Sequence, residues 1–168
     1  MATLQDVYQW VRFLHLFGVI IFFLGHGASA SVSFRLRTER DPERLRALLD
    51  LSASSYRALV IGFFWIIVTG SILGYIGGWW ERAWFWASIV LLFVIAGLMT
   101  PLVAAPYHKV RRALGLKVPF ASKKEWEKPV PKLEEIDGVL RSARPVAAAI
   151  VGFVGTAIIL WLMMFKPF

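Results

Sequence analysis

The sequence predicts an all-α protein that crosses a lipid bilayer as a four-helix transmembrane bundle. Three observations lead to this prediction. First, 58% of the 168 residues are hydrophobic, whereas soluble domains contain roughly 45–50% apolar residues. Second, four stretches are long and apolar enough to cross the hydrocarbon core, which takes about 20 helical residues. Third, all eleven acidic residues and all lysines lie outside these stretches, so no stretch has the charged face that a helix of a soluble bundle needs.

The predicted spans cover residues 10–33, 58–76, 83–105 and 146–164. Between them lie a loop at 34–57, a short connection, and a loop at 106–145. A chain of this length is the size of one domain, so we expect a single transmembrane domain over residues 1–168. Arg12, near the outer edge of the first span, is long enough to extend its charge to the headgroups.

The basic residues predict the orientation of the bundle. Sixteen of the 19 lysines and arginines lie in the two loops 34–57 and 106–145. An even number of crossings places both loops on one side, and the positive-inside rule makes that side cytoplasmic. Both termini are then outside the cytoplasm. The tryptophans agree, because aromatic residues gather at membrane interfaces, and six fall near the outer one: Trp10, Trp79, Trp80, Trp84, Trp86 and Trp161.

Each cytoplasmic loop contains a predicted short helix. In the first loop, Asp41-Pro42 is typical of a helix start. An apolar face follows at Leu45, Leu48, Leu49 and Ser52, which predicts an amphipathic helix on the membrane surface or against the bundle. The second loop contains Pro119, Pro129 and Pro131 and is expected to be irregular. A further short helix over 132–141 would place Leu133, Ile136 and Leu140 on one side.

One face of the first span carries the residues of chemical interest. These are two histidines, two glycines, two serines and one phenylalanine: His15, Gly18, Phe22, Gly25, His26, Ser29 and Ser33. At helical periodicity they share one side, while the rest of the helix is aliphatic or aromatic. Polar groups facing lipid are costly, so this stripe is expected to face the bundle interior or an internal cavity.

Two interpretations of the stripe remain open. It is a packing seam with interhelical hydrogen bonds, or its histidines bind a haem iron or another metal. His15 and His26 are separated by about 16 Å of helix rise, so they cannot share one iron. Matching levels from the outer ends places His26 opposite Met99, with His108 deeper. The cofactor hypothesis is therefore haem b, with His26, His15 and Met99 as candidate ligands and Gly18 and Gly25 as contacts for its flat face.

Several other functions find no support in the sequence. There is no cysteine, which excludes disulfides and thiolate sites. No span contains Asp or Glu, so an intramembrane proton relay has no candidate residue. No phosphate-binding glycine loop or hydrolytic triad is visible. Nucleic-acid binding is not expected, because membrane topology and anionic lipid account for the basic loops. Enzymatic activity is not indicated.

The segment Leu14-His15-Leu16-Phe17-Gly18 leading to Gly25, followed by an arginine-rich loop with Asp41-Pro42, resembles small bacterial multi-helix membrane families of uncharacterised function. Those families are similar to the copper-resistance D proteins and to the membrane protoporphyrinogen oxidase. The resemblance implies the bacterial inner membrane as location and association with haem or porphyrin. In the oxidase type a first-helix histidine, here His15, acts with a lysine in a later span, and no span of this chain contains lysine.

The sequence therefore favours a small membrane protein that binds a b-type haem or similar redox group through its first-helix histidines. One alternative is a non-catalytic accessory subunit, whose partners besides lipid would be a larger membrane complex or further copies of the chain. A second alternative is a permease for a small molecule or a metal.

The predicted orientation can be tested with a reporter fused after Phe168. We expect a reporter that is active only outside the cytoplasm to be active there, because basic loops are retained on the cytoplasmic side. Activity of a reporter that works only in the cytoplasm would contradict the orientation.

Overall fold

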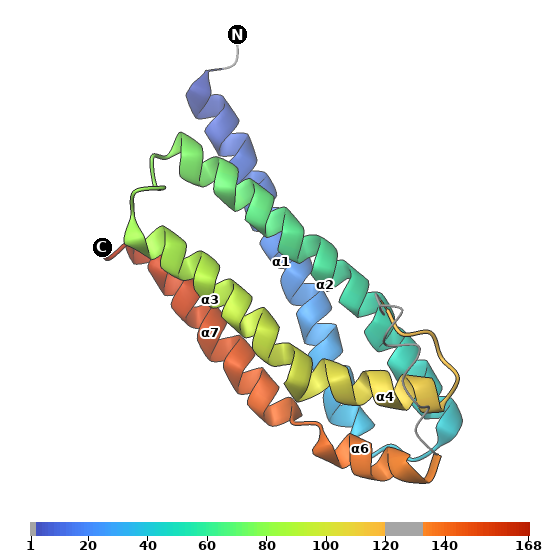
Figure 1. Cartoon of the computed structure of the whole chain (residues 1–168). Helices are drawn as coiled ribbons and strands as arrows, with labels where there is room; N and C mark the ends of the chain where they lie inside the picture. The colour runs from blue at the N-terminus through green and yellow to red at the C-terminus, as the bar shows by residue number, and fades with distance from the viewer. Residues whose placement is uncertain (1–2, 120–132) are drawn as a thin grey trace.

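The computed structural model describes residues 3–119 and 133–168, which form helices and their connections without any strand. The first two helices are α1 (Leu4–Leu36) and α2 (Pro42–Ile76). Next, α3 (Ala83–Met99) continues through a π-helical turn, η1 (Thr100–Ala104), into α4 (Ala105–Ala113). A 3₁₀ turn, η2 (Leu133–Glu135), α6 (Ile136–Ser142) and α7 (Pro145–Phe165) complete the described chain (Figure 1). Four helical segments are long and apolar enough to span a membrane, which confirms the predicted fold class.

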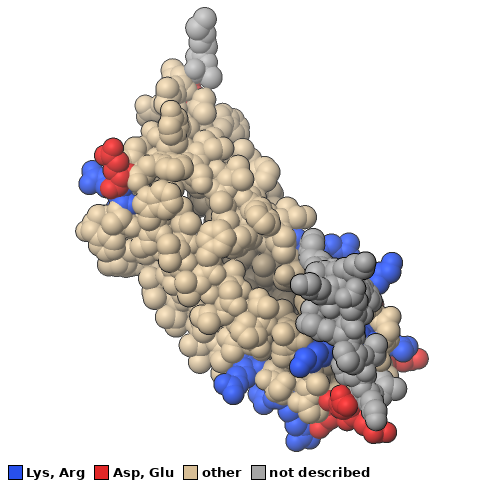
Figure 2. Space-filling view, viewed as in Figure 1, with Lys and Arg blue, Asp and Glu red and all other residues tan. Residues whose placement is uncertain are grey.

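The two ends of the bundle differ in charge. Both chain termini lie at one end, and the α1–α2 connection lies with α4 and α6 at the other (Figure 1). Most basic and acidic side chains visible in Figure 2 gather at this second end. The structure therefore brings the basic segments to one side, as an even number of crossings requires. Which compartment that side faces remains a prediction.

The predicted amphipathic helix of the first loop forms the start of α2. The connection is short, since α1 ends at Leu36 and α2 begins at Pro42. Asp41 caps α2 by accepting hydrogen bonds from the amides of Arg44 (3.0 Å) and Glu43 (2.8 Å), which lower its pKa. Extending this capped helix is easier than nucleating a second one, so residues 42–57 do not form a separate element.

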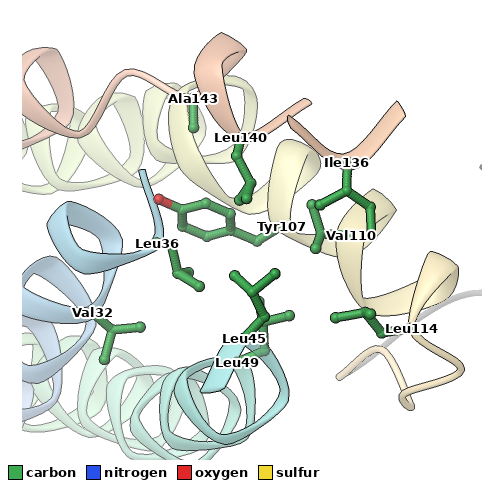
Figure 3. Close-up of a cluster of buried hydrophobic side chains, with 10 residues drawn as sticks. All are labelled: Val32, Leu36, Leu45, Leu49, Tyr107, Val110, Leu114, Ile136, Leu140 and Ala143. Carbon is green, nitrogen blue, oxygen red and sulfur yellow. The ribbon is translucent and has the colours of Figure 1, made fainter. Parts of the chain in front are cut away.

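Two hydrophobic clusters close the bundle at its ends. At the charged end, the predicted apolar face of early α2 packs against α1, α4 and α6, and Tyr107 lies at the centre (Figure 3). The Tyr107 hydroxyl donates to the carbonyl of Ser33 (3.0 Å). The predicted helix near residue 136 also belongs here, with Ile136 and Leu140 buried. Lys132, Pro129 and Pro131 lie outside the described residues.

At the terminal end, the second cluster is aromatic. Trp84, Phe85 and Leu162 are buried there. The ammonium group of Lys166 lies 4.1 Å from the centre of the Trp79 ring, a cation–π contact. The predicted outer belt of tryptophans thus contributes contacts between helices as well as an interface with lipid.

Between the ends, α1 and α2 approach each other through glycines. A Cβ atom at Gly25 would lie 3.1 Å from the Ser55 carbonyl oxygen, and one at Gly62 would lie 3.2 Å from the backbone of Phe22. Lipid tails are as apolar as the helices, so such close contact, rather than the hydrophobic effect, holds membrane helices together.

Gly25→Leu is expected to destabilise the protein by about 1–3 kcal/mol, because its side chain would force the α1 and α2 backbones apart. Gly27→Leu is the matched control, since a Cβ at Gly27 meets no atom within 4 Å. Thermal unfolding of both variants in the same detergent measures the difference. Equal melting temperatures would contradict the close contact.

Candidate functional site

The four long helices line a cavity of about 460 Å³, partly open to the outside, between the two end clusters. Its walls come from α1, α2, the α3–η1–α4 segment and α7. The cavity exists because α1 packs along α2 and α3 along α7, whereas contacts between the two pairs are sparse. The Phe63–Phe93 ring contact joins α2 to α3, and a Trp80–Phe85 contact joins the α2–α3 connection to α3. A hollow is visible in the apolar surface near the middle of the molecule (Figure 2).

His26 projects from α1 into this cavity. Its ring stacks almost parallel to that of Phe22, with centroids 6.1 Å apart. A Cβ atom at Gly152 of α7 would lie 2.9 Å from His26 Nε2 and 3.5 Å from Met99 Cε. His26 and Met99 therefore converge on Gly152, the proximity that level-matching along the helices predicts. Whether they bind a metal together remains a prediction.

His15 lies in a different environment, buried between α1 and α2. Its Nδ1 is 2.9 Å from the Thr69 hydroxyl oxygen, and that hydroxyl donates its proton to the Trp65 carbonyl (2.7 Å). With the hydroxyl proton on the Trp65 carbonyl, the hydroxyl oxygen is left to accept from the Nδ1–H tautomer of His15. His15 does not line the cavity. Its contacts agree with the packing interpretation of the stripe.

The two glycines of the predicted cofactor site also face α2. Gly18 contacts the indole of Trp65, whose Nε1 donates to the Leu14 carbonyl (2.9 Å). Gly25 contacts the α2 backbone, as described above. Neither glycine lines the cavity, so neither presents its face to a ligand there. The stripe is thus divided: Gly18, Gly25 and His15 pack against α2, while Phe22, His26, Ser29 and Ser33 line the cavity.

A π-helical turn shapes the α3 side of the cavity. In a regular α-helix the carbonyl of Leu102 would accept from the amide of residue 106, but Pro106 has no N–H. The amide of Arg144, just before α7, donates to this carbonyl instead (3.0 Å). Met99 and Thr100 at the start of the turn line the cavity, as do Val103 and Ala104. Pro106 therefore leaves a carbonyl of this turn free to bond to the start of α7.

Arg111 of α4 lines the charged end of the cavity, where His108 also contributes. The side chain of Arg111 is only 7% exposed. It donates to the carbonyls of Leu49 and Lys117, each at 2.6 Å, and to the Asp50 carboxylate at 3.0 Å. Arg111 does not stand out in the sequence as a site residue, because the positive-inside rule already accounts for a basic residue in this loop. Its position four residues after Tyr107 is the signal that places both on one helical face.

The described part of the chain contains no group of three or more histidine, aspartate or glutamate side chains that could hold a metal ion. A metal site built from several protein ligands therefore has no candidate in residues 3–119 and 133–168.

Four apolar helices around an internal cavity define an integral membrane protein of small size. The chain belongs to the family described as predicted integral membrane protein (DUF2269), whose sequence profile matches residues 9–167. No curated protein and no solved structure matches it. This membership supports the resemblance to an uncharacterised membrane family, and it adds no support for the copper-resistance D or protoporphyrinogen oxidase types.

The hydrogen bond between His15 and Thr69 can be tested with a double-mutant cycle. We expect His15→Ala and Thr69→Ala each to reduce the free energy of unfolding, with a coupling of about 0.6–2 kcal/mol, because the bond joins α1 to α2 within the membrane. Unfolding in detergent with denaturant measures the four stabilities. Additive effects would show that the two side chains do not interact.

Proposed function

We propose that this protein binds a small molecule with an apolar body in the cavity between its two helix pairs. The observation that carries the proposal is the cavity itself. Its volume of about 460 Å³ lies within the 300–1,000 Å³ common for ligand sites, and clefts between bundle helices are frequent ligand sites.

Small residues keep this space open. Ala96 on α3 and Ala148, Ala149 and Gly152 on α7 line the cavity. Protein interiors are normally packed as densely as organic crystals, with few voids larger than a water molecule. Larger aliphatic side chains at these positions would fill the space at no chemical cost in an apolar helix. Yet α7 has only alanine or glycine at the lining positions 148, 149 and 152. This supports the view that the open volume serves to bind a molecule.

The position of His26 indicates that the bound molecule has a polar atom near the middle of the molecule. No hydrogen bond joins its ring to another of the described residues, although it lies in a largely apolar wall. An imidazole without a partner at this depth costs free energy. A hydroxyl, carbonyl or ring nitrogen of a bound molecule would offset this cost. The ring of Phe22 beside it would contact the apolar part of the same molecule.

Haem b is the cofactor expected from the sequence, and the geometry around His26 tests its fit. Imidazole and thioether are a known pair of axial ligands, and His26 and Met99 do converge. However, Nε2 points at Gly152, and the imidazole would have to turn away before this atom could face an iron. The described arrangement does not fit a coordinated haem, so haem is one outcome of the experiment below rather than our proposal.

The other functional alternatives share the same first step. An accessory subunit would hold the molecule for a partner protein, and a permease would release it on another side of the membrane. Both require that the cavity be occupied. Binding is therefore the property to test first.

Gly152→Leu should abolish ligand retention, because its side chain would overlap His26 and fill the cavity. We expect at least about tenfold less of the molecule, corresponding to roughly 1.4 kcal/mol of overpacking. Gly97→Leu is the control, since a Cβ at Gly97 meets no atom within 4 Å. The measurement is mass spectrometry of organic extracts from each purified protein, with an optical spectrum of the same samples.

A compound present in the wild type and in Gly97→Leu but lost from Gly152→Leu would support the proposal. A Soret band that follows the same pattern would identify the compound as haem. Equal extracts from all three proteins, at equal yield and dispersity, would contradict the proposal.

A further inference from the structure

The charged end of the cavity contains a buried positive charge that the proposed function does not use. Arg111 lines this end with a side chain that is 7% exposed. A guanidinium group stays protonated at any physiological pH. Burying it is costly, and such residues in membrane proteins usually mark a pathway or a ligand site.

The described neighbours of Arg111 compensate this charge only in part. Two of its partners, the carbonyls of Leu49 and Lys117, are neutral. The third, Asp50, has a side chain that is 61% exposed, so water screens its carboxylate. The described partners of Arg111 therefore leave part of its positive charge unbalanced at this end of the cavity.

The rest of the cavity has the opposite character. Away from Arg111 its walls are largely aliphatic and aromatic, ending at Phe63, which meets Phe93 across α2 and α3. Besides Arg111, the titratable side chains among the described lining residues are those of His26, Tyr56, Tyr107 and His108. The space thus joins a cationic end to an apolar body within one continuous volume.

We infer that the ligand is an amphipathic carboxylate with one elongated, mainly apolar body. Its carboxylate lies at Arg111, a polar atom of the body lies at His26, and the apolar end extends toward Phe63. This inference rests on the proposed function and names the class of molecule that the cavity takes. Nη1 and Nη2 of Arg111 each carry a second N–H besides the one that donates to Leu49 or Asp50, and a carboxylate accepts such charge-assisted hydrogen bonds. A monoanion also suits the local charge better than a phosphate monoester, because Asp50 already shares the guanidinium group.

The probe for this inference is 11-(dansylamino)undecanoic acid, compared with its uncharged methyl ester. Binding is followed by dansyl fluorescence with the full chain in phosphatidylcholine nanodiscs, which carry no net surface charge. We expect the acid to bind the wild type about tenfold more tightly than the ester, as charge-assisted hydrogen bonds provide. Arg111→Gln should remove this preference.

Asp50→Asn is expected to increase the preference for the acid, and it leaves the buried Arg111 in place. It takes away the carboxylate that competes for Arg111, so the acid should bind about two- to fivefold more tightly, the range typical of exposed ion pairs. Affinity for the ester should not change. Arg46→Gln is the matched control for surface charge, because Arg46 is exposed on early α2 and does not line the cavity. It should alter neither affinity.

The outcomes separate this inference from the proposed function. Equal binding of acid and ester, with both lost in Gly152→Leu, would overturn the carboxylate and leave the binding function in place. Binding of neither probe to the wild type would overturn both. If Arg111→Gln does not fold, Asp50→Asn decides, and no gain for the acid would overturn the inference. Competition by dodecyl phosphate that is stronger than by dodecanoate would overturn the choice of carboxylate.

Discussion

Close backbone contact between α1 and α2 determines how the other two long helices can pack. In a bilayer, helices gain little from excluding water, so they associate through small residues and hydrogen bonds. Gly25 and Gly62 bring the two backbones together, and His15 bonds to Thr69 at another level of the same contact. The small residues and the hydrogen bond of this contact are used between α1 and α2, so they are not available for packing against α3 and α7.

The cavity follows from this self-contained pairing. The α3–α7 pair is held by contacts of its own, such as Ile95 against Gly155, and the two pairs are joined mainly at their ends. Tyr107 and its neighbours close the charged end, and the aromatic cluster around Trp84 closes the other. Pro106 makes the charged end possible, because it leaves the Leu102 carbonyl to the amide of Arg144. The middle stays open because few contacts join the two pairs there.

The sequence predicts the fold well, because length, hydropathy and charge placement act along each helix separately. It predicts the site only in part. The stripe on α1 does face inward, yet which neighbour each residue meets depends on how α1 is rotated against α2 and α7. The rotation of α1 about its axis places His15 against Thr69 and His26 in the cavity. The residue pattern of a single helix does not determine this rotation. Arg111 was missed for a related reason, since an arginine near a membrane surface already has an explanation. The carbonyls that bond to Arg111 belong to Leu49, which is far from it in the sequence, and to Lys117, which lies beyond the end of α4.

Occupancy of the space between the two helix pairs by a small molecule can be measured on the intact protein. Native mass spectrometry of the protein, released gently from lipid nanodiscs prepared directly from its membrane, tests this most directly. The account predicts a species heavier than the chain by one molecule of the size common for small ligands, and a loss of this species in a variant whose cavity is filled. A wild-type spectrum that contains only the mass of the chain, under conditions that retain ligands in other membrane proteins, would contradict it.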